Sequence, residues 1–173
     1  MAIAVDAMGG DRPLTVQVAA AVQAVKDFGI EVIIVGAEAQ INQQLKQYSY
    51  DQQKVRVVNS TEIVEMNESP ANALRQKKDS SIRVSVDLVK AGEADAVVSA
   101  GNTGASMATA KYVLKSIEGI ERPAIASIMP SVKRNHTYVL LDVGANTDCK
   151  PLYLFQFALM GDAYARTYLH LEN

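Results

Sequence analysis

Short apolar segments alternate with segments of helical periodicity over the first third of the chain. Residues 2–6, 31–35 and 55–58 are short apolar runs with β-branched side chains, which is typical of buried strands. The segments between them carry apolar residues at helical spacing, and the first of these ends before Gly29. Strands that alternate with helices in this way predict a parallel sheet with right-handed crossovers.

The second half of the chain predicts one antiparallel strand pair. The apolar runs at 124–129 and 137–143 are separated by too few residues for a crossover helix. We therefore expect an α/β fold of three layers, α/β/α, with a mostly parallel sheet and one antiparallel pair, as a single domain over residues 1–173. The other expected elements are two successive helices, the first with Ser69 as its N-cap and the second capped from within Asp79-Ser80-Ser81. A strand at 95–99 and helices at 103–115 and 152–169 follow.

Composition and charge favour a protein of the cytoplasm. The chain of 173 residues is 49% hydrophobic and has a net charge of −2, without the basic stripe of a general nucleic-acid binder. No apolar run approaches the roughly 18–20 residues that span a bilayer. The N-terminus has no basic segment of the secretory type, and the single cysteine, Cys149, excludes an internal disulfide.

Three glycine-containing turns each follow a predicted strand. They read DAMGGD at 6–11, SAGNTGA at 99–105 and LDVGAN at 141–146. In an open α/β sheet, ligands bind outside the carboxyl ends of the strands, so the three turns are expected to line one crevice. Glycine allows backbone N–H groups to approach an anion, and a following helix adds its positive end. The turns therefore predict a phosphate site.

The SAGNTGA turn is the strongest candidate for holding the phosphate. It offers hydroxyl, amide and backbone donors, and its candidate phosphate-binding residues are Ser99, Gly101, Asn102, Thr103 and Gly104. The alternative is that Thr103 is an ordinary N-cap and the glycines ease the turn.

The DAMGGD turn adds a second glycine pair. Gly9 and Gly10 are further candidates for phosphate binding, and the alternative is a tight turn in which Asp11 caps the next helix. A Mg²⁺ site made by Asp6, Asp11 and Asp142 is less favoured than hydrogen-bond positioning by these carboxylates. We expect no metal and no cofactor.

Charged residues outside the first two turns supply further candidates. Lys77 and Lys78 belong to a basic cluster that is either a solvated face or a source of positive charge for phosphate. Asp142 and Asn146 belong to the LDVGAN turn. A second basic loop at 133–136, with Lys133, Arg134 and His136, either faces solvent or docks an acidic partner.

Two features near the C-terminus have a chemical and a structural interpretation. Cys149 next to Lys150 is either an activated nucleophile or, as we favour, an ordinary thiol, because no histidine is adjacent. The segment LYLFQFAL at 152–159 is apolar nearly all round, which predicts burial in the core or in an oligomer interface.

Five motifs together resemble one family along the whole chain, in order. They are DAMGGD, ESPANALRQKKDSSI at 68–82, EADAVVSAGNTGA at 93–105, IERPAIASIMP at 121–130 and LDVGANTDCKP at 141–151. They resemble PlsX, the bacterial phosphate acyltransferases of phospholipid synthesis, whose chains are considerably longer, so that this chain is similar to their N-terminal half. The resemblance implies a fold similar to phosphotransacetylases and to the isocitrate dehydrogenase group.

The resemblance also implies an activity and partners. A long-chain acyl group would pass from acyl carrier protein to inorganic phosphate, giving acyl phosphate for phosphatidic acid synthesis. It implies a homodimer, a membrane acyltransferase that uses the product, and peripheral contact with the membrane. The candidate catalytic residues are Lys77, Asn146 and Asp142, with Lys78 offsetting the charge of the phosphate. The alternatives are a short-chain phosphate acyltransferase that uses a coenzyme A thioester, and a non-catalytic binding module.

Overall fold

The computed structural model describes residues 1–133, 136–144, 146 and 148–170. The chain forms two compact units, residues 1–115 and residues 116–173, and each is described by itself. The prediction of a single domain stays a prediction, because compactness alone does not decide whether two units fold cooperatively. Arg134, which belongs to the expected basic loop, lies outside the described residues.

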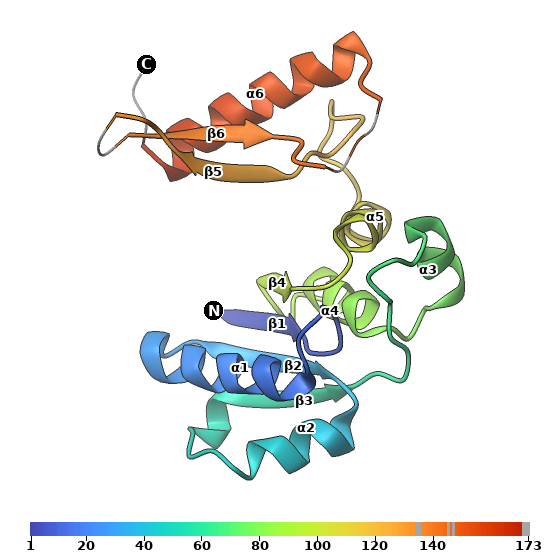
Figure 1. Ribbon diagram of the computed structural model, residues 1–173, viewed down its shortest axis with the longest axis vertical. Helices are drawn as coiled ribbons and strands as arrows, with labels where there is room; N and C mark the ends of the chain where they lie inside the picture. The colour runs from blue at the N-terminus through green and yellow to red at the C-terminus, as the bar shows by residue number, and fades with distance from the viewer. Residues whose placement is uncertain (134–135, 145, 147, 171–173) are drawn as a thin grey trace. The chain divides into compact units, whose positions relative to one another are not determined.

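The first unit is built on a parallel sheet of four strands (Figure 1). The strands are β1 (Ala2–Asp6), β2 (Glu31–Gly36), β3 (Val55–Asn59) and β4 (Ala96–Ser99), in the order β3-β2-β1-β4. All residues of β2 after the first are buried, as the continuous apolar run of a strand covered on both faces requires. The parallel α/β architecture predicted from the alternating segments is confirmed.

The strand order reverses beside β1. The chain moves outward from β1 to β2 and β3, and it returns with β4 to the other side of β1. Asp6, the last residue of β1, is in register with Ser99, the last residue of β4. The carboxyl ends of β1 and β4 therefore flank a topological switch point, which is where open α/β sheets bind their ligands.

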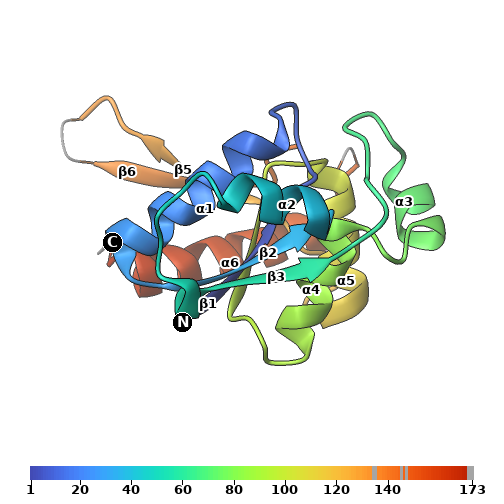
Figure 2. The same cartoon turned by 90° about the horizontal axis from the view of Figure 1, so that it is seen from below.

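Helices cover both faces of this sheet (Figure 2). On one face, α1 (Leu14–Phe28) and α2 (Glu38–Leu45) bury a cluster that includes Ile34 of β2. On the other face, α4 (Ser81–Lys90) packs against Ile33 of the same strand. Neighbouring residues of a strand point to opposite faces of the sheet, and each face is covered by helices. The first unit therefore has the three layers expected from the sequence.

The helix boundaries differ in detail from the sequence-based expectations. Helix α1 has Pro13 as its N-cap, so Asp11 does not cap it, and it ends at Gly29, whose φ of 64° is left-handed. Ser69 occupies its N-cap position as predicted, and Ser80 is the N-cap among the three candidates for α4, but neither side chain makes a capping hydrogen bond. The remaining helices of this unit are the 3₁₀ turn η1 (Gln52–Lys54), α3 (Pro70–Gln76) and α5 (Thr103–Leu114).

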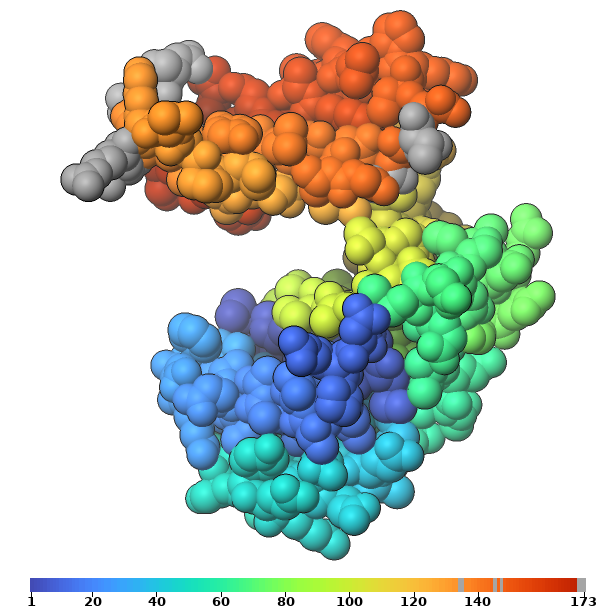
Figure 3. Space-filling view, viewed as in Figure 1, coloured from blue at the N-terminus to red at the C-terminus, as the bar shows by residue number. Residues whose placement is uncertain are grey.

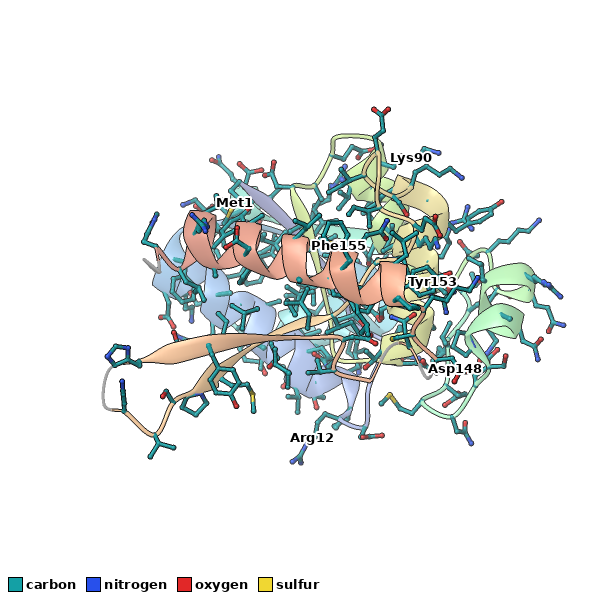
Figure 4. All side chains as sticks on the ribbon, turned by 90° about the horizontal axis from the view of Figure 1, so that it is seen from above. Met1, Arg12, Lys90, Asp148, Tyr153 and Phe155 are labelled. Carbon is teal, nitrogen blue, oxygen red and sulfur yellow. The ribbon has the colours of Figure 1, made fainter. Side chains whose placement is uncertain are left out.

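The second unit consists of a strand pair and a long helix. Strand β5 (Ala126–Pro130) pairs antiparallel with β6 (Thr137–Leu141), as predicted, and α6 (Pro151–Tyr168) lies along the pair (Figure 1). In the apolar segment of α6, Phe157 is enclosed and Phe155, labelled in Figure 4, is 60% exposed, so burial of this segment in an oligomer interface stays a prediction. Within the described ranges, no helix is long and apolar enough to cross a membrane.

Candidate anion-binding site at the ends of β1 and β4

The turns after β1 and β4 touch through their glycines. A Cβ atom on Gly9 would lie 3.0 Å from the Cα of Gly101, and a Cβ on Gly101 would lie 3.1 Å from the Cα of Gly9. In the space-filling view, the blue turn after β1 borders the yellow-green segment after β4 (Figure 3). The DAMGGD and SAGNTGA turns therefore meet at one place, as the sequence predicted, and they meet because neither glycine has a side chain.

Gly10 makes a second close approach between the same two turns. Its φ is 101°, and a Cβ there would lie 2.7 Å from the carbonyl oxygen of Ala100. Beyond it, Arg12 is exposed and points away from the sheet (Figure 4). Gly9 and Gly10 thus allow the backbone contact, and direct phosphate binding by them stays a prediction.

The buried carboxylate of Asp6 lies directly beneath this contact. Asp6 is 2% exposed, and a Cβ on Gly9 would come within 2.4 Å of its Oδ2 atom. Its Oδ1 accepts hydrogen bonds from the hydroxyl of Ser81 at 2.6 Å and from the backbone N–H groups of Gly9 and Met8 at 3.0 and 3.2 Å. Its Oδ2 accepts from the hydroxyl of Ser99 at 2.7 Å. Asp6 therefore joins β1, β4 and the first turn of α4.

The hydroxyl proton of Ser99 is used within the protein. It donates its proton to Asp6, and it accepts the N–H of Gly101 at 3.1 Å. A serine hydroxyl has one proton to donate, so Ser99 as placed here has none for a phosphate oxygen. Its prediction as a phosphate ligand stays untested, and its contacts give it a positioning role.

Asn102 is the N-cap of α5 and also holds the preceding loop. Its Oδ1 accepts the N–H of Ala105 at 3.0 Å, so Asn102 rather than Thr103 is the cap. Its Nδ2 donates to the backbone carbonyls of Glu65, Met66 and Glu68 at 3.1, 3.0 and 2.9 Å. The amide protons are directed to these carbonyls, so phosphate binding by the Asn102 side chain stays a prediction that its contacts do not support.

The first turn of α5 leaves two N–H groups free. In the described part of the chain, the backbone N–H groups of Thr103 and Gly104 have no acceptor, and the Thr103 hydroxyl has no partner. Unpaired N–H groups at a helix N-terminus attract an anion, together with the positive end of the helix dipole. Gly104 also allows close helix packing, since a Cβ there would lie 2.7 Å from Cγ of Pro70 in α3.

The space beneath the two turns is narrow. It is bordered by Asp6, Gly9, Ser81, Gly101 and Asn102, and it has no room for a water molecule. A phosphate would therefore bind on the outer side of the turns, next to the free N–H groups of α5, and would not touch Asp6.

The two predicted lysines have different surroundings. The Nζ of Lys77 lies 2.5 Å from Oε2 of Glu68 and 2.5 Å from the carbonyl oxygen of Ile63. This hydrogen bond holds the pKa of the Glu68 carboxyl below its ordinary value. Lys77 thus fastens the loop before α3, whereas Lys78 is exposed and has no ion pair among the residues that the structure describes.

The LDVGAN turn belongs to the second unit and is held by local hydrogen bonds. Oδ1 of Asp142 accepts the backbone N–H and the Nδ2 group of Asn146 at 3.1 and 2.8 Å. Oδ1 of Asn146 in turn accepts Nε of Arg122 at 2.6 Å. Two predicted catalytic residues, Asp142 and Asn146, therefore contact each other, and the prediction that their turn lines the same crevice as the other two stays a prediction.

Cys149 has the surroundings of an ordinary thiol. Its Sγ lies 3.6 Å from Oδ2 of Asp142, and desolvation together with this carboxylate raises the pKa of the thiol. Lys150, the proposed activator, places its Nζ over the ring of Tyr153 at 5.9 Å, on the helix labelled in Figure 4. A raised pKa disfavours the thiolate, which agrees with the preferred interpretation of Cys149.

Three contact residues were not identified from the sequence. In the sequence, Ser81 is one of three candidate caps for a helix, and Glu68 and Arg122 are parts of motifs without an assigned role. Their partners lie 75, 9 and 24 residues away along the chain, so no local pattern reveals them.

Known proteins resemble the chain in sequence and in fold. The family described as "Fatty acid synthesis protein" matches residues 1–173. Phosphate acyltransferases of Geotalea uraniireducens and Geotalea daltonii are 53% and 51% identical over the whole chain, which covers 49% of each relative. The phosphate acyltransferase of Clostridioides difficile is 44% identical, with 51% of its length covered. The chain thus spans about half the length of these curated relatives.

Solved structures confirm the fold class. A phosphotransacetylase from Streptococcus pyogenes has a TM-score of 0.69 at 21% identity, over 96% of this chain and 54% of its own. The EutD phosphotransacetylase from Staphylococcus aureus has a TM-score of 0.66 at 18% identity, over 95% of this chain and 52% of its own. The family match over every residue shows that the chain belongs to the fatty acid synthesis protein family.

Proposed function

We propose that the protein is a phosphate acyltransferase that transfers a long-chain acyl group from acyl carrier protein to inorganic phosphate. The product, an acyl phosphate, would serve phosphatidic acid and phospholipid synthesis. The names of the curated relatives support acyl transfer to phosphate. The chain, about half as long as those relatives, would supply the phosphate-binding part of the enzyme.

The observation that carries this proposal is the free first turn of α5 at the switch point of the sheet. The unpaired N–H groups of Thr103 and Gly104 lie where ligands of α/β sheets bind. Both are donors, as a phosphate dianion requires, and the carboxylate of Asp6 beneath the turns already accepts four hydrogen bonds. The turn therefore offers attraction to an anion without an exposed carboxylate beneath it.

In the proposed reaction, a phosphate oxygen attacks the carbonyl carbon of the thioester. A C–O bond forms, the tetrahedral intermediate collapses, and the C–S bond breaks, so that the carrier leaves as a thiolate and takes up a proton. Holding two substrates in attack geometry supplies roughly 7–11 kcal/mol, so no covalent enzyme intermediate is needed. The raised pKa of Cys149 is consistent with this direct route.

Charge and oxyanion stabilisation are assigned to the remaining candidates. Lys78 would offset the phosphate charge, and Lys77 would do so after releasing Glu68. Backbone N–H groups or Asn146 would donate to the oxyanion, and loss of such a donor typically costs about 3–4 kcal/mol. The amide of Asn146 donates to Asp142 and to the carbonyl of Pro123, so it would have to release one of these bonds first.

The decisive experiment is an assay of the full-length protein with a long-chain acyl–acyl carrier protein and inorganic phosphate. Acyl phosphate is trapped with hydroxylamine and counted as hydroxamate, and we expect its formation to require phosphate. The same assay with acetyl-coenzyme A identifies the short-chain alternative if that donor is preferred. A folded full-length protein that forms no acyl phosphate from either donor would be the binding module.

The partners follow from the same proposal. Acyl carrier protein is the donor, a second copy of the chain forms a dimer, and a membrane acyltransferase takes the product at the cytoplasmic membrane surface. Light scattering of the full-length protein measures the dimer. Co-sedimentation with anionic vesicles measures the peripheral contact.

A further inference from the structure

We propose that Asp6 is a positioning residue for phosphate and that it acts through Ser99. This inference rests on the proposed function, because it concerns how the first turn of α5 is held ready for the anion. It assigns a role to a buried carboxylate that does not itself reach the phosphate.

The argument begins with the cost of burying Asp6. A carboxylate that is 2% exposed has lost nearly all its water, and it is stable because protein donors replace that water. All four donors are hydroxyl or backbone N–H groups, and no ion pair of the described chain includes Asp6. Asp6 is therefore held by uncharged donors, and its two oxygens fix the directions of these donors.

Asp6 orients the SAGNTGA turn in two steps. Because the Ser99 hydroxyl donates to Oδ2 of Asp6, its lone pairs face the opposite direction, and one accepts the N–H of Gly101. The fixed peptide of Gly101 leads directly into Asn102, the N-cap, and the free N–H groups of Thr103 and Gly104. Without Ser99, the Gly101 peptide loses its acceptor and the free N–H groups lose their common direction.

A second serine on the same carboxylate provides a matched control. Ser81 donates to Oδ1 at 2.6 Å, and Ser99 donates to Oδ2 at 2.7 Å. Both hydrogen bonds connect a distant segment to Asp6. Ser81 belongs to α4, however, whereas Ser99 belongs to the SAGNTGA turn. If both serines act only on stability, replacing either one by alanine should change the KM for phosphate equally. If Ser99 positions the phosphate-binding turn, only its replacement should raise that KM.

The test compares Ser99→Ala with Ser81→Ala in the full-length protein. We expect both variants to melt at a lower temperature. Only Ser99→Ala should raise the KM for phosphate, by about five- to tenfold for one lost hydrogen bond, while the KM for the acyl donor stays within twofold. Equal phosphate KM values in the two variants would overturn the proposal.

A double-mutant cycle separates positioning from direct contact. In Asp6→Asn, the amide oxygen still accepts from Ser81, but the amide nitrogen faces Ser99 and no longer accepts its proton. If Ser99 acts through Asp6, adding Ser99→Ala to Asp6→Asn raises the phosphate KM no further. Multiplied effects would show that Ser99 binds phosphate itself. Should Asp6→Asn fail to fold, the serine pair decides alone.

Binding of radiolabelled inorganic phosphate, measured by equilibrium dialysis, separates this inference from the proposed function. If the unmodified protein binds phosphate but makes no acyl phosphate, the proposed function fails, and the serine comparison still decides the inference from the two dissociation constants. If it makes acyl phosphate and Ser99→Ala binds phosphate normally, only the inference fails. A protein that neither binds phosphate nor makes acyl phosphate refutes both.

Discussion

Asp6 and Asp142 occupy the same kind of position and are used differently. Each follows the apolar part of a strand, precedes a glycine turn and accepts backbone N–H groups. Asp6 is buried and binds side chains 75 and 93 residues away, whereas the side-chain partners of Asp142 lie within seven residues. The same local pattern therefore builds a long-range tie in one unit and a local turn in the other.

The backbone at these two aspartates differs as well. Asp6 is the last residue of a regular strand, but Asp142 has a left-handed φ of 64°. Aspartate tolerates this conformation because its side chain can bond locally, as Asp142 does with Asn146. Replacing each aspartate should therefore remove a different kind of interaction.

The largest contrast is expected between Asp6→Ala and Asp142→Ala. The first change leaves two hydroxyls and two N–H groups without their buried acceptor, and we expect a loss of about 3 kcal/mol or more in the free energy of unfolding. The second places alanine at a left-handed φ and should cost about 1–2 kcal/mol. Urea unfolding followed by circular dichroism measures both, and equal losses would contradict the distinction.

Glycine substitutions sharpen the comparison in the two turns. A Cβ on Gly9 meets Asp6 Oδ2 at 2.4 Å and the backbone of Gly101 at 3.0 Å, so Gly9→Ala should cost about 2–3 kcal/mol through overpacking. Gly144 has a φ of 94° and no atom within 4 Å of an added Cβ, so Gly144→Ala should cost about 1–2 kcal/mol through backbone strain alone. Thermal unfolding measures the loss of stability in each variant, and a larger loss in Gly144→Ala than in Gly9→Ala would contradict our interpretation.

The two asparagines should differ by a smaller amount. Asn102→Ala removes a helix cap and the donor to three carbonyls, so we expect a loss of about 1–2 kcal/mol and a higher phosphate KM. Asn146→Ala removes bonds within a partly exposed turn and should cost about 1 kcal/mol. Asn42→Ala, on the exposed face of α2, is the control. An unchanged phosphate KM in Asn102→Ala would remove the SAGNTGA turn from the proposed site.

The smallest expected effect concerns the thiol of Cys149. Because desolvation and Asp142 raise its pKa, iodoacetamide should modify Cys149 more slowly near neutral pH than it modifies a free cysteine. The midpoint of the rate against pH should lie above the ordinary thiol pKa. Asp142→Asn suits the left-handed φ and removes the charge, so it should move that midpoint down. Mass spectrometry of the modified peptide follows the rate, and an upward shift would refute this account.

Local patterns predicted the strands and turns because their causes lie within a few residues. The apolar run at 31–35 predicted β2, and Gly29 predicted the end of α1. The meeting of the DAMGGD and SAGNTGA turns followed from general rules for parallel sheets. These features need no knowledge of distant side chains.

The site chemistry was harder to predict because its partners are distant in sequence. Asn102 looks like a phosphate donor until its carbonyl partners, 34 to 37 residues earlier, are known. Lys77 looks like a free cation until Glu68 is placed beside it. The composition of α6 also does not reveal which of its residues the chain itself encloses, and within the described chain these are Gln156 and Phe157.

The long reach of the Asp6 hydrogen bonds has a consequence for folding. Bonds that close loops of 75 and 93 residues form late, because distant segments must first be brought together. A chain that is being synthesised at about 5–20 residues per second needs roughly 5–20 seconds after Asp6 is made before Ser99 exists. During that interval β1 and β2 can pair, but the aspartate has neither distant hydroxyl until Ser81 is made, and the Ser99 hydroxyl comes last. The SAGNTGA turn, which is proposed to bind phosphate, would thus be among the last parts of its unit to form.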